Sequence, residues 1–234
     1  MKRFYTLVST SQNPSGWSVD LDGKSVKTPL GTLLCAPTEA LANLMLEEWS
    51  AQVDEITPDT MPITQIVTTA IDRVGKERVE IERQALAYLH TDMICYRADQ
   101  PESYVKRQDA AWTPWVDWFE AQTGDRLKTT TALIAITQSD KNNQYVSNYI
   151  KNLDLYSLTI FQLLVSITGS IVLTMAFMAK EFDTTTLFNL SHVEDLLKSE
   201  IYNEDFYGIA PTQERKWDAT KKDFAAIQQI MDCL

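Results

Sequence analysis

The stretch IFQLLVSITGSIVLTMAFMA, from Ile160 to Ala179, decides which kind of fold this chain can adopt. A membrane-spanning helix needs about 20 predominantly apolar residues, and this stretch has that length. However, it contains Gly169 near its middle and several polar residues, namely Gln162, Ser166, Thr168, Ser170 and Thr174. Neither flank has the excess of lysine and arginine that orients membrane helices. We therefore expect two buried helices, broken near Thr168 and Gly169, and no stable membrane insertion.

The composition indicates a folded, acidic protein. The chain has 234 residues, and 44% of them are hydrophobic, which is enough for a sizeable core. Its formal net charge of −11 and its pI near 4.7 argue against nucleic acid and anionic membranes as partners, because both attract basic surfaces. The first residues, MKRFYTLVST, lack the apolar core of a signal peptide and the length of a transit peptide. We therefore expect a cytoplasmic location.

Metal and cofactor motifs are missing from the sequence. Cys35, Cys95 and Cys233 lie far apart and form no Cys-x-x-Cys motif, which argues against a disulfide framework and a zinc cluster. His90 and His192 are the only histidines. The glycine-rich loops and nucleophile motifs of common enzyme classes do not occur. We therefore expect no metal, no cofactor, no catalytic residue and no enzymatic activity.

The N-terminal part of the chain has the pattern of short antiparallel strands. Asp22 and Gly23 are typical of a tight hairpin turn between two such strands. Alternating or β-branched residues predict strands at Phe4 to Val8, Trp17 to Leu21, Val26 to Thr28 and Thr32 to Cys35. We expect a small antiparallel sheet that is curled into a barrel-like unit.

A helix and a proline-containing segment follow the predicted sheet. Thr38 is expected to cap a helix whose inner face includes Leu41 and Met45. The segment Ile56 to Thr64 contains two prolines, which disfavour helix and strand, so it is the predicted linker. The predicted fold class is α+β. A small N-terminal β domain with one helix covers residues 1–58, and a larger, mainly α-helical C-terminal domain covers residues 59–234.

Most of the C-terminal domain has a helical pattern. Breaks are expected at Gly75, Pro114 and Gly124. The aromatic cluster of Trp112, Trp115, Trp118 and Phe119 is expected to belong to the core, with a binding platform as the alternative. The segment from Thr129 to Thr137 is either a strand or an extended linker. Later helices are expected at residues 141–152, 155–167, 169–182 and 212–233.

Two polar groups lie beside apolar runs in this domain. Asp92 and Arg97 favour a structural ion pair over acid–base chemistry. The residues from Thr168 to Ser170 could present backbone N–H groups to an anion at a helix start. Close packing between two helices is the favoured interpretation for these small residues.

The stretch SHVEDLLKSEIYNEDFYG, from Ser191 to Gly208, places a carboxylate where a helix normally carries an apolar side chain. Ser191 and Glu194 have the spacing of a capping box, which predicts a helix that starts at Ser191 and runs to Gly208. Glu200 lies on the apolar stripe of this helix, which is formed by Val193, Leu196, Leu197 and Ile201. Such a carboxylate is either solvated at the protein edge or meets a polar partner, because burying it alone is costly.

Six short motifs occur in an order that resembles one protein family. They are LDGKSVKTP at Leu21 to Pro29, EEWSAQ at Glu47 to Gln52, MPIT at Met61 to Thr64, TDMICYRA at Thr91 to Ala98, PWVDW at Pro114 to Trp118 and TGS at Thr168 to Ser170. Together they resemble the ATP synthase assembly chaperone that holds the alpha subunit of the catalytic head in mitochondria and alphaproteobacteria. The resemblance covers nearly the whole chain and implies the same two-part architecture.

The resemblance also marks residues of the stretch from Ser191 to Gly208. The family pattern there reads Glu-x-x-Gln-x-x-x-Trp-Gly, so the resemblance implies a functional role for Glu200. Asn203 and Tyr207 depart from that pattern, having a shorter amide and a smaller aromatic ring. The partner-binding residues expected from the apolar stripe and the resemblance together are Glu200, Asn203, Glu204, Tyr207, Leu197 and Ile201.

The resemblance implies a chaperone that binds the free alpha subunit of F-type ATP synthase and shields its interfaces until the beta subunit arrives. It further implies a chain that is monomeric when free, in the bacterial cytoplasm or, for eukaryotic relatives, in the mitochondrial matrix. Two other functions stay open, namely an enzyme that uses Glu200 as an acid or base and a membrane-associated scaffold.

Overall fold

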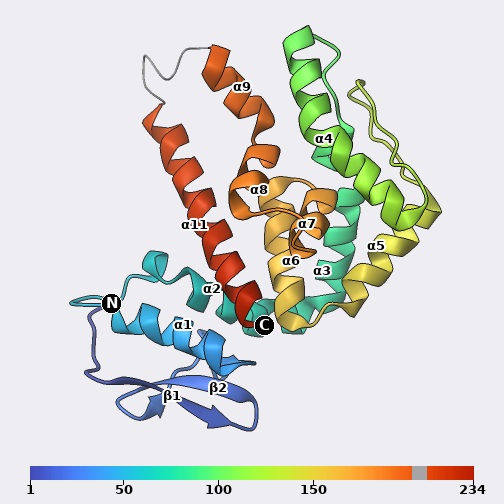
Figure 1. Ribbon diagram of the computed structural model, residues 1–234. Helices are drawn as coiled ribbons and strands as arrows, with labels where there is room; N and C mark the ends of the chain where they lie inside the picture. Colours follow the sequence, from blue (N-terminus) through green and yellow to red (C-terminus); the bar gives the residue numbers. More distant parts are fainter. Residues whose placement is uncertain (202–209) are drawn as a thin grey trace. The chain divides into compact units, whose positions relative to one another are not determined.

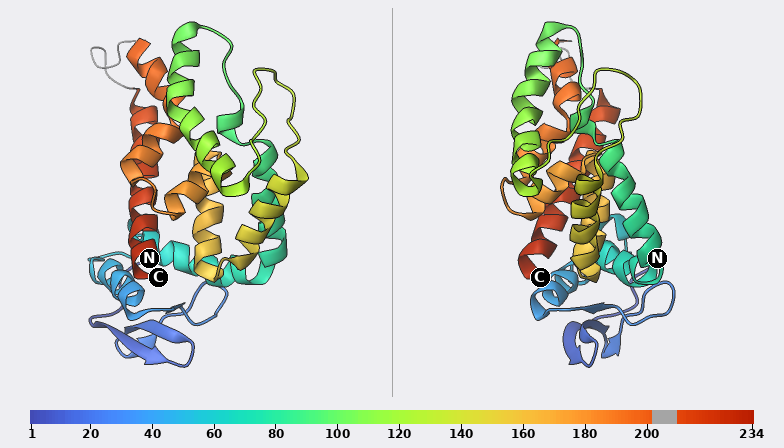
Figure 2. Two further views of the ribbon diagram at one scale, coloured as in Figure 1. Left: turned by 45° about the vertical axis from the view of Figure 1, so that its right-hand side comes forward. Right: turned by 90° about the vertical axis from the view of Figure 1, so that its right-hand side faces the viewer.

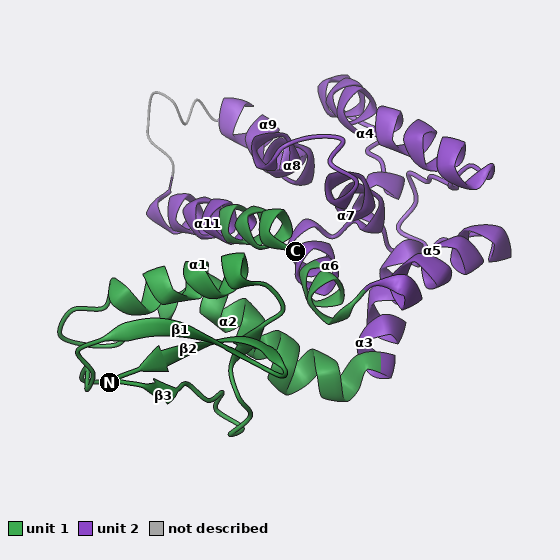
Figure 3. Ribbon diagram, turned by 60° about the horizontal axis from the view of Figure 1, so that its bottom comes forward, with its two compact units in different colours: residues 1–78, 154–160, 225–234 green, residues 79–153, 161–224 purple. Residues whose placement is uncertain are grey.

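The computed structural model describes residues 1–201 and 210–234. Spatial contacts divide the chain into two compact units, which Figure 3 shows in different colours. Unit 1 comprises residues 1–78, 154–160 and 225–234, and unit 2 comprises residues 79–153 together with the described part of 161–224. The domain boundary that we expect between residues 58 and 59 follows chain order rather than these contacts, and it stays a prediction.

Unit 1 begins with the small antiparallel sheet that the sequence predicts (Figure 1). Its described strands are β1 (Val8–Asn13), β2 (Gly16–Leu21), β3 (Lys24–Ser25) and β4 (Cys35–Ala36). β2 pairs with β1 along its whole length, with β4 near its first residues and with β3 near its last residues. The sheet does not close on itself, so it is barrel-like only in a loose sense.

Asp22 and Gly23 form the predicted hairpin turn, with φ angles of 49° and 77°. The first strand begins later than predicted because the backbone N–H groups of Thr6 and Leu7 donate to the Asp22 carboxylate instead of to a neighbouring strand. The two strands predicted after the turn are also shorter than expected. They are reduced to a single bridge between Lys27 and Leu33 and to β4.

Helix α1 (Glu39–Ser50) packs against β1 and β2, and Thr38 caps it as predicted by accepting the Leu41 N–H at 3.2 Å. Its far end holds the next helix, α2 (Pro62–Thr69). The Glu48 carboxylate accepts the N–H groups of Ile63 and Thr64 at 2.8 and 2.7 Å, which satisfies two free donors at the start of α2. The motifs EEWSAQ and MPIT therefore meet through one carboxylate.

The remaining elements are helical, and most of them follow the predicted order. A π-helical segment (Ala70–Val74) joins α2 to α3 (Gly75–Ala87), so the break predicted at Gly75 is not a loop. The other described elements are the 3₁₀ segments Pro58–Thr60, Tyr88–His90 and Met93–Cys95 and the helices α4 (Glu102–Thr123), α5 (Asp140–Asn152), α6 (Leu155–Thr168), α7 (Ile171–Met178), α8 (Thr184–Ser191), α9 (Val193–Ile201) and α11 (Pro211–Cys233).

Helix α4 corrects a prediction, because Pro114 lies inside it and does not break it. Pro114 itself is exposed, whereas Trp112 and Phe119 are buried on the opposite side of the helix. An interior proline costs about 3 kcal/mol, and the burial of two aromatic side chains exceeds that cost. Gly124 ends α4 in the left-handed conformation, with a φ of 65°, as predicted.

The apolar stretch from Ile160 to Ala179 forms most of α6 and all of α7, and the two helices are separated at Gly169 as predicted. Gly169 has a φ of 67°, a conformation that glycine adopts without steric cost. Among the described helices, none combines the length and the apolar character that a membrane crossing requires. Residues 129–137 form an extended connection whose single bridge joins Thr130 to Tyr96, so the linker alternative holds and the strand alternative is wrong.

Candidate functional site

The expected helix of the C-terminal stretch begins later than predicted. α8 ends at Ser191, whose hydroxyl donates to the Leu187 carbonyl at 2.8 Å, and α9 begins at Val193. The predicted capping box is therefore wrong. The observed cap belongs to the preceding helix. The Asp183 carboxylate accepts the N–H of Thr186 at 2.8 Å and starts α8. The predicted end at Gly208 lies outside the described residues.

Helices α4 and α9 lie side by side in unit 2 (Figure 2). The indole N–H of Trp112 donates to the carbonyl of Leu190, the residue that precedes the end of α8, at 2.8 Å. The Gln108 amide donates to the Glu194 carboxylate at 2.8 Å. Farther along α9, Glu200 forms an ion pair with Arg107 of α4. The contacts follow the two helices in opposite directions, so α4 and α9 are antiparallel.

Glu200 lies at the exposed edge of the contact between α4 and α9. Its side chain is 56% exposed and that of Arg107 is 46% exposed. Ion pairs with this exposure contribute only about 0–1 kcal/mol to stability, so Glu200 is not required to hold the two helices together. Leu197 is buried and anchors α9, whereas Ile201 is 53% exposed. Glu200 and Ile201 are therefore accessible to a partner.

Three of the predicted partner-binding residues lie outside the described residues. They are Asn203, Glu204 and Tyr207, and their role stays a prediction.

Arg97 contacts residues of α4 and does not pair with Asp92, which belongs to the same motif. Its guanidinium donates to the Gln108 carbonyl at 3.1 Å, pairs with Asp109 at 3.3 Å and lies 5.3 Å from the centre of the Trp112 ring. The structural ion pair predicted between Asp92 and Arg97 is therefore wrong. Arg97 instead supports α4 behind the residues that meet α9.

Asp92 is a fully buried carboxylate that joins two motifs of the resemblance. It accepts the N–H of Ile94 at 3.2 Å and the N–H of Val172, at the start of α7, at 3.0 Å. The N–H of Met93 donates to the Gly169 carbonyl at 2.9 Å, so the motif TDMICYRA contacts both the motif TGS and the start of α7. Burial raises the pKa of Asp92 to about 6, although its N–H hydrogen bonds act in the opposite direction. Asp92 thus satisfies N–H groups that an external anion would otherwise bind.

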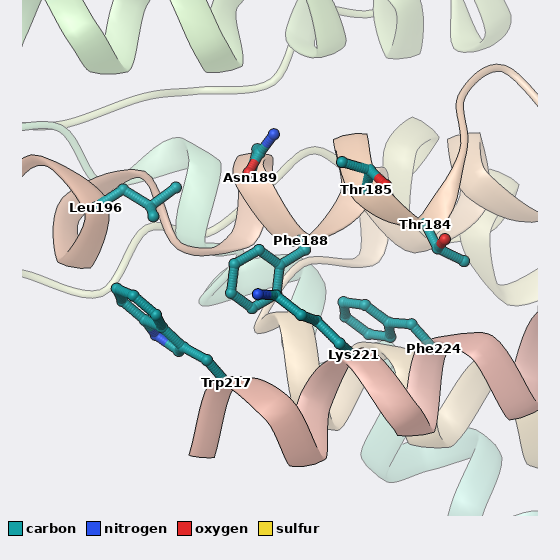
Figure 4. A pocket seen from close by; sticks show the side chains of 8 residues that line it. All are labelled: Thr184, Thr185, Phe188, Asn189, Leu196, Trp217, Lys221 and Phe224. Atoms are coloured by element: carbon teal, nitrogen blue, oxygen red, sulfur yellow. The ribbon is translucent and has the colours of Figure 1, made fainter. Parts of the chain in front are cut away.

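A groove of about 390 Å³ lies between α8 and α11 in unit 2, and Figure 4 shows the side chains that line it. Aromatic side chains form much of it, with the rings of Phe188 and Trp217 in an edge-to-face arrangement at 6.0 Å. The Lys221 ammonium lies 4.8 Å from the centre of the Phe188 ring. The lining residues are Thr184, Thr185, Phe188, Asn189, Leu196, Trp217, Lys221 and Phe224.

Sequence reasoning missed this groove. Trp217 and Phe224 lie seven residues apart, which is the spacing of one face of the helix predicted at residues 212–233, but this spacing does not tell which part of the face stays accessible. Lys221 gave no signal, because a lysine on an amphipathic helix usually lies on the solvated face. Among the described residues, no cluster of three or more side chains has the composition of a metal site.

Comparison with known proteins decides the family. A model of the family described as ATP12 chaperone protein matches residues 2–120. The chain belongs to this family. The resemblance to the ATP synthase assembly chaperones, which rests on six motifs, is thereby confirmed.

A named relative and two solved structures match the chain over most of its length. The mitochondrial protein atp12 of Schizosaccharomyces pombe is 25% identical over 205 residues, which cover 82% of this chain and 70% of the relative. The crystal structure of Atp12 from Paracoccus denitrificans has a TM-score of 0.89 at 28% identity and covers 99% of this chain and 97% of that chain. The Atu1473 protein from Agrobacterium tumefaciens also has a TM-score of 0.89, at 27% identity, covering 99% of this chain and 85% of that chain. These similarities confirm the predicted α+β class.

Proposed function

We propose that this chain is a non-enzymatic chaperone that binds the free alpha subunit of F-type ATP synthase and covers its interfaces until the beta subunit arrives. Membership of the ATP12 chaperone family is the observation that carries the proposal. The chaperone acts as a monomer in the cytoplasm of an alphaproteobacterium, in line with the bacterial origin of the Atp12 structure from Paracoccus denitrificans. The named mitochondrial relative supports a matrix location in eukaryotes.

The physical need for such a chaperone follows from ring assembly. A subunit that will be enclosed by neighbours exposes apolar surface while it is free, and this surface drives aggregation. A chaperone that covers the surface reversibly keeps the subunit available. The beta subunit then displaces the chaperone by forming the larger permanent interface.

In this proposal the partner binds at the exposed end of α9. Ile201 supplies apolar contact and Glu200 supplies a charge-assisted hydrogen bond to an arginine or a backbone N–H of the alpha subunit. Leu197 contributes by fixing α9 from inside, and Asn203, Glu204 and Tyr207, which lie outside the described residues, add further contacts with the partner. A charged contact of this kind selects the partner more than it tightens binding.

The two other functions have less support from the structure. Acid–base catalysis by Glu200 needs an enclosed site, whereas its carboxylate is exposed and paired with Arg107. A membrane-associated scaffold needs apolar helix surface for lipid, whereas Ile171 to Phe177 of the most apolar helix are all buried.

Glu200→Ala is expected to weaken binding of the free alpha subunit by about tenfold or more, because a charge-assisted contact is worth about 1.5–3 kcal/mol. Arg107→Ala is the matched control, since it removes the other half of the same ion pair and leaves the Glu200 carboxylate in place. Its binding is expected to stay within about twofold of that of the original chain. Both dissociation constants are measured by titrating labelled alpha subunit.

The control also separates two roles for Glu200. If Arg107→Ala weakens binding as much as Glu200→Ala does, the carboxylate acts by positioning α9 against α4 and the proposed contact with the partner is wrong. If neither variant changes binding or the yield of assembled ATP synthase in cells, Glu200 has no part in the function.

A further inference from the structure

The groove between α8 and α11 combines an aromatic floor with a single cationic side chain. Phe188, Trp217 and Phe224 are each at most 7% exposed, so they form a packed floor that does not need to rearrange. Leu196 of α9 closes one end, as Figure 4 shows. A volume of about 390 Å³ accommodates one bulky apolar side chain together with part of its backbone.

The charge of the groove differs from that of the whole chain. Its lining residues include the cation Lys221 and no carboxylate, although the chain has a net charge of −11. Within the described residues, the Lys221 ammonium contacts the face of Phe188 and forms no ion pair. An ammonium held beside an apolar surface favours a carboxylate, because partial removal from water strengthens their attraction.

We infer that this groove is a second docking site for the alpha subunit, taking a segment that carries a bulky apolar side chain next to an aspartate or glutamate. The apolar side chain enters the groove over Phe188 and Trp217, and the neighbouring carboxylate binds Lys221. This inference rests on the proposed function, because it names the same partner. It adds a contact that is separate from Glu200.

A small free anion is a weaker fit to the same groove. The groove offers such an anion one ammonium and neither a guanidinium nor a described cluster of backbone N–H donors, whereas tight anion sites use several donors. Its apolar floor contributes only when the occupant has apolar surface to bury.

The test compares three variants of the full chain for binding of purified alpha subunit. Lys221→Glu reverses the charge in the groove, and Asn189→Trp fills the groove from an exposed position on its wall. Lys222→Glu is the matched control, because Lys222 is exposed on the same helix and does not line the groove. Lys221→Glu and Asn189→Trp are each expected to raise the dissociation constant about tenfold, and Lys222→Glu to leave it within about twofold.

The outcomes distinguish this inference from the proposed function. If the original chain binds the alpha subunit and Lys221→Glu binds equally well, the groove is not a docking site while the proposed function stands. An equal loss of affinity in Lys221→Glu and Lys222→Glu would show that the net charge of the chain, and not the groove, causes the effect. This result would overturn the inference. If the original chain does not bind the alpha subunit, the proposed function is wrong and the occupant named for the groove is wrong with it.

Discussion

Asp92→Ala is expected to lower the free energy of unfolding by about 3 kcal/mol near neutral pH, because two buried backbone N–H groups lose their acceptor. These are the N–H of Ile94 and the N–H of Val172 at the start of α7. The helix also loses the negative charge that its N-terminus favours. The measurement is urea unfolding followed by circular dichroism.

The pH dependence of this loss identifies its cause. The carboxyl of an unfolded chain titrates near its ordinary pKa of 3.8, whereas burial raises the pKa of Asp92 to about 6 in the folded chain. Between these values the folded chain binds more protons, so the stability contributed by Asp92 falls as the pH rises through this window. The loss in Asp92→Ala is therefore expected to be about 1 kcal/mol larger near pH 5 than near pH 7.5.

Asp183→Ala is the control for Asp92→Ala. Asp183 also caps a helix, but it is exposed, so its removal is expected to cost only about 1 kcal/mol. A loss in Asp92→Ala no greater than that in Asp183→Ala would contradict the assignment of Asp92 as a buried junction between two segments.

Gly16→Ala is expected to destabilise the sheet by about 4 kcal/mol, because two separate costs combine. Gly16 has a φ of 127°, a backbone conformation that residues other than glycine rarely adopt. An added Cβ would overlap the carbonyl oxygen of Ala36 and lie 3.2 Å from the carbonyl carbon. Ala36 belongs to β4 and pairs with Trp17, so the clash cannot be relieved without separating β4 from β2.

Gly23→Ala isolates the conformational part of that cost. Gly23 has a φ of 77°, and an added Cβ there meets nothing within 4 Å. Its loss of stability is expected to be about 1 kcal/mol. Both variants are measured by urea unfolding, and equal losses at the two positions would show that the approach of Ala36 to Gly16 does not matter.

The helices, strands and turns of this fold could be predicted from the sequence better than the contacts between them. Local signals sufficed for the Asp22 turn, the cap at Thr38 and the break at Gly169, because each depends on the residue and its immediate neighbours. The same signals failed at Ser191, where the capping-box spacing occurs inside the end of another helix. Only the upstream cap at Asp183 shows where that helix begins.

The motifs of the resemblance were recognised without their physical role. Glu48 is a partly buried carboxylate and Asp92 a fully buried one, and the donors to such carboxylates would be sought among basic side chains, as the incorrect pair of Asp92 with Arg97 shows. Their actual partners are backbone N–H groups of Ile63, Thr64 and Val172. Because every residue except proline has such a donor, sequence gives no signal for which one a carboxylate reaches.

The candidate site was predictable only in part for a similar reason. The apolar stripe placed Glu200 on the side of α9 that faces α4, and the family pattern drew attention to the residue. Neither indicated Arg107, which lies on another helix and forms the observed ion pair. The groove around Lys221 depends on how α8 and α11 pack, which no local pattern contains.

In the proposed function, the chain recognises an unassembled subunit by contacts alone and catalyses no reaction. The junctions at Glu48 and Asp92 keep their segments in place, and the proposed contacts with the partner are made by Glu200, Ile201 and the groove. Reversible contacts suit a protein that must later be displaced, since each is small compared with a permanent subunit interface.

The most direct test is to mix the purified chain with purified free alpha subunit and to analyse the mixture by native mass spectrometry. The proposed function requires a complex of one chain with one alpha subunit, and it requires that added beta subunit releases the chain. The absence of a complex with the alpha subunit, or a complex that the beta subunit does not displace, would contradict it.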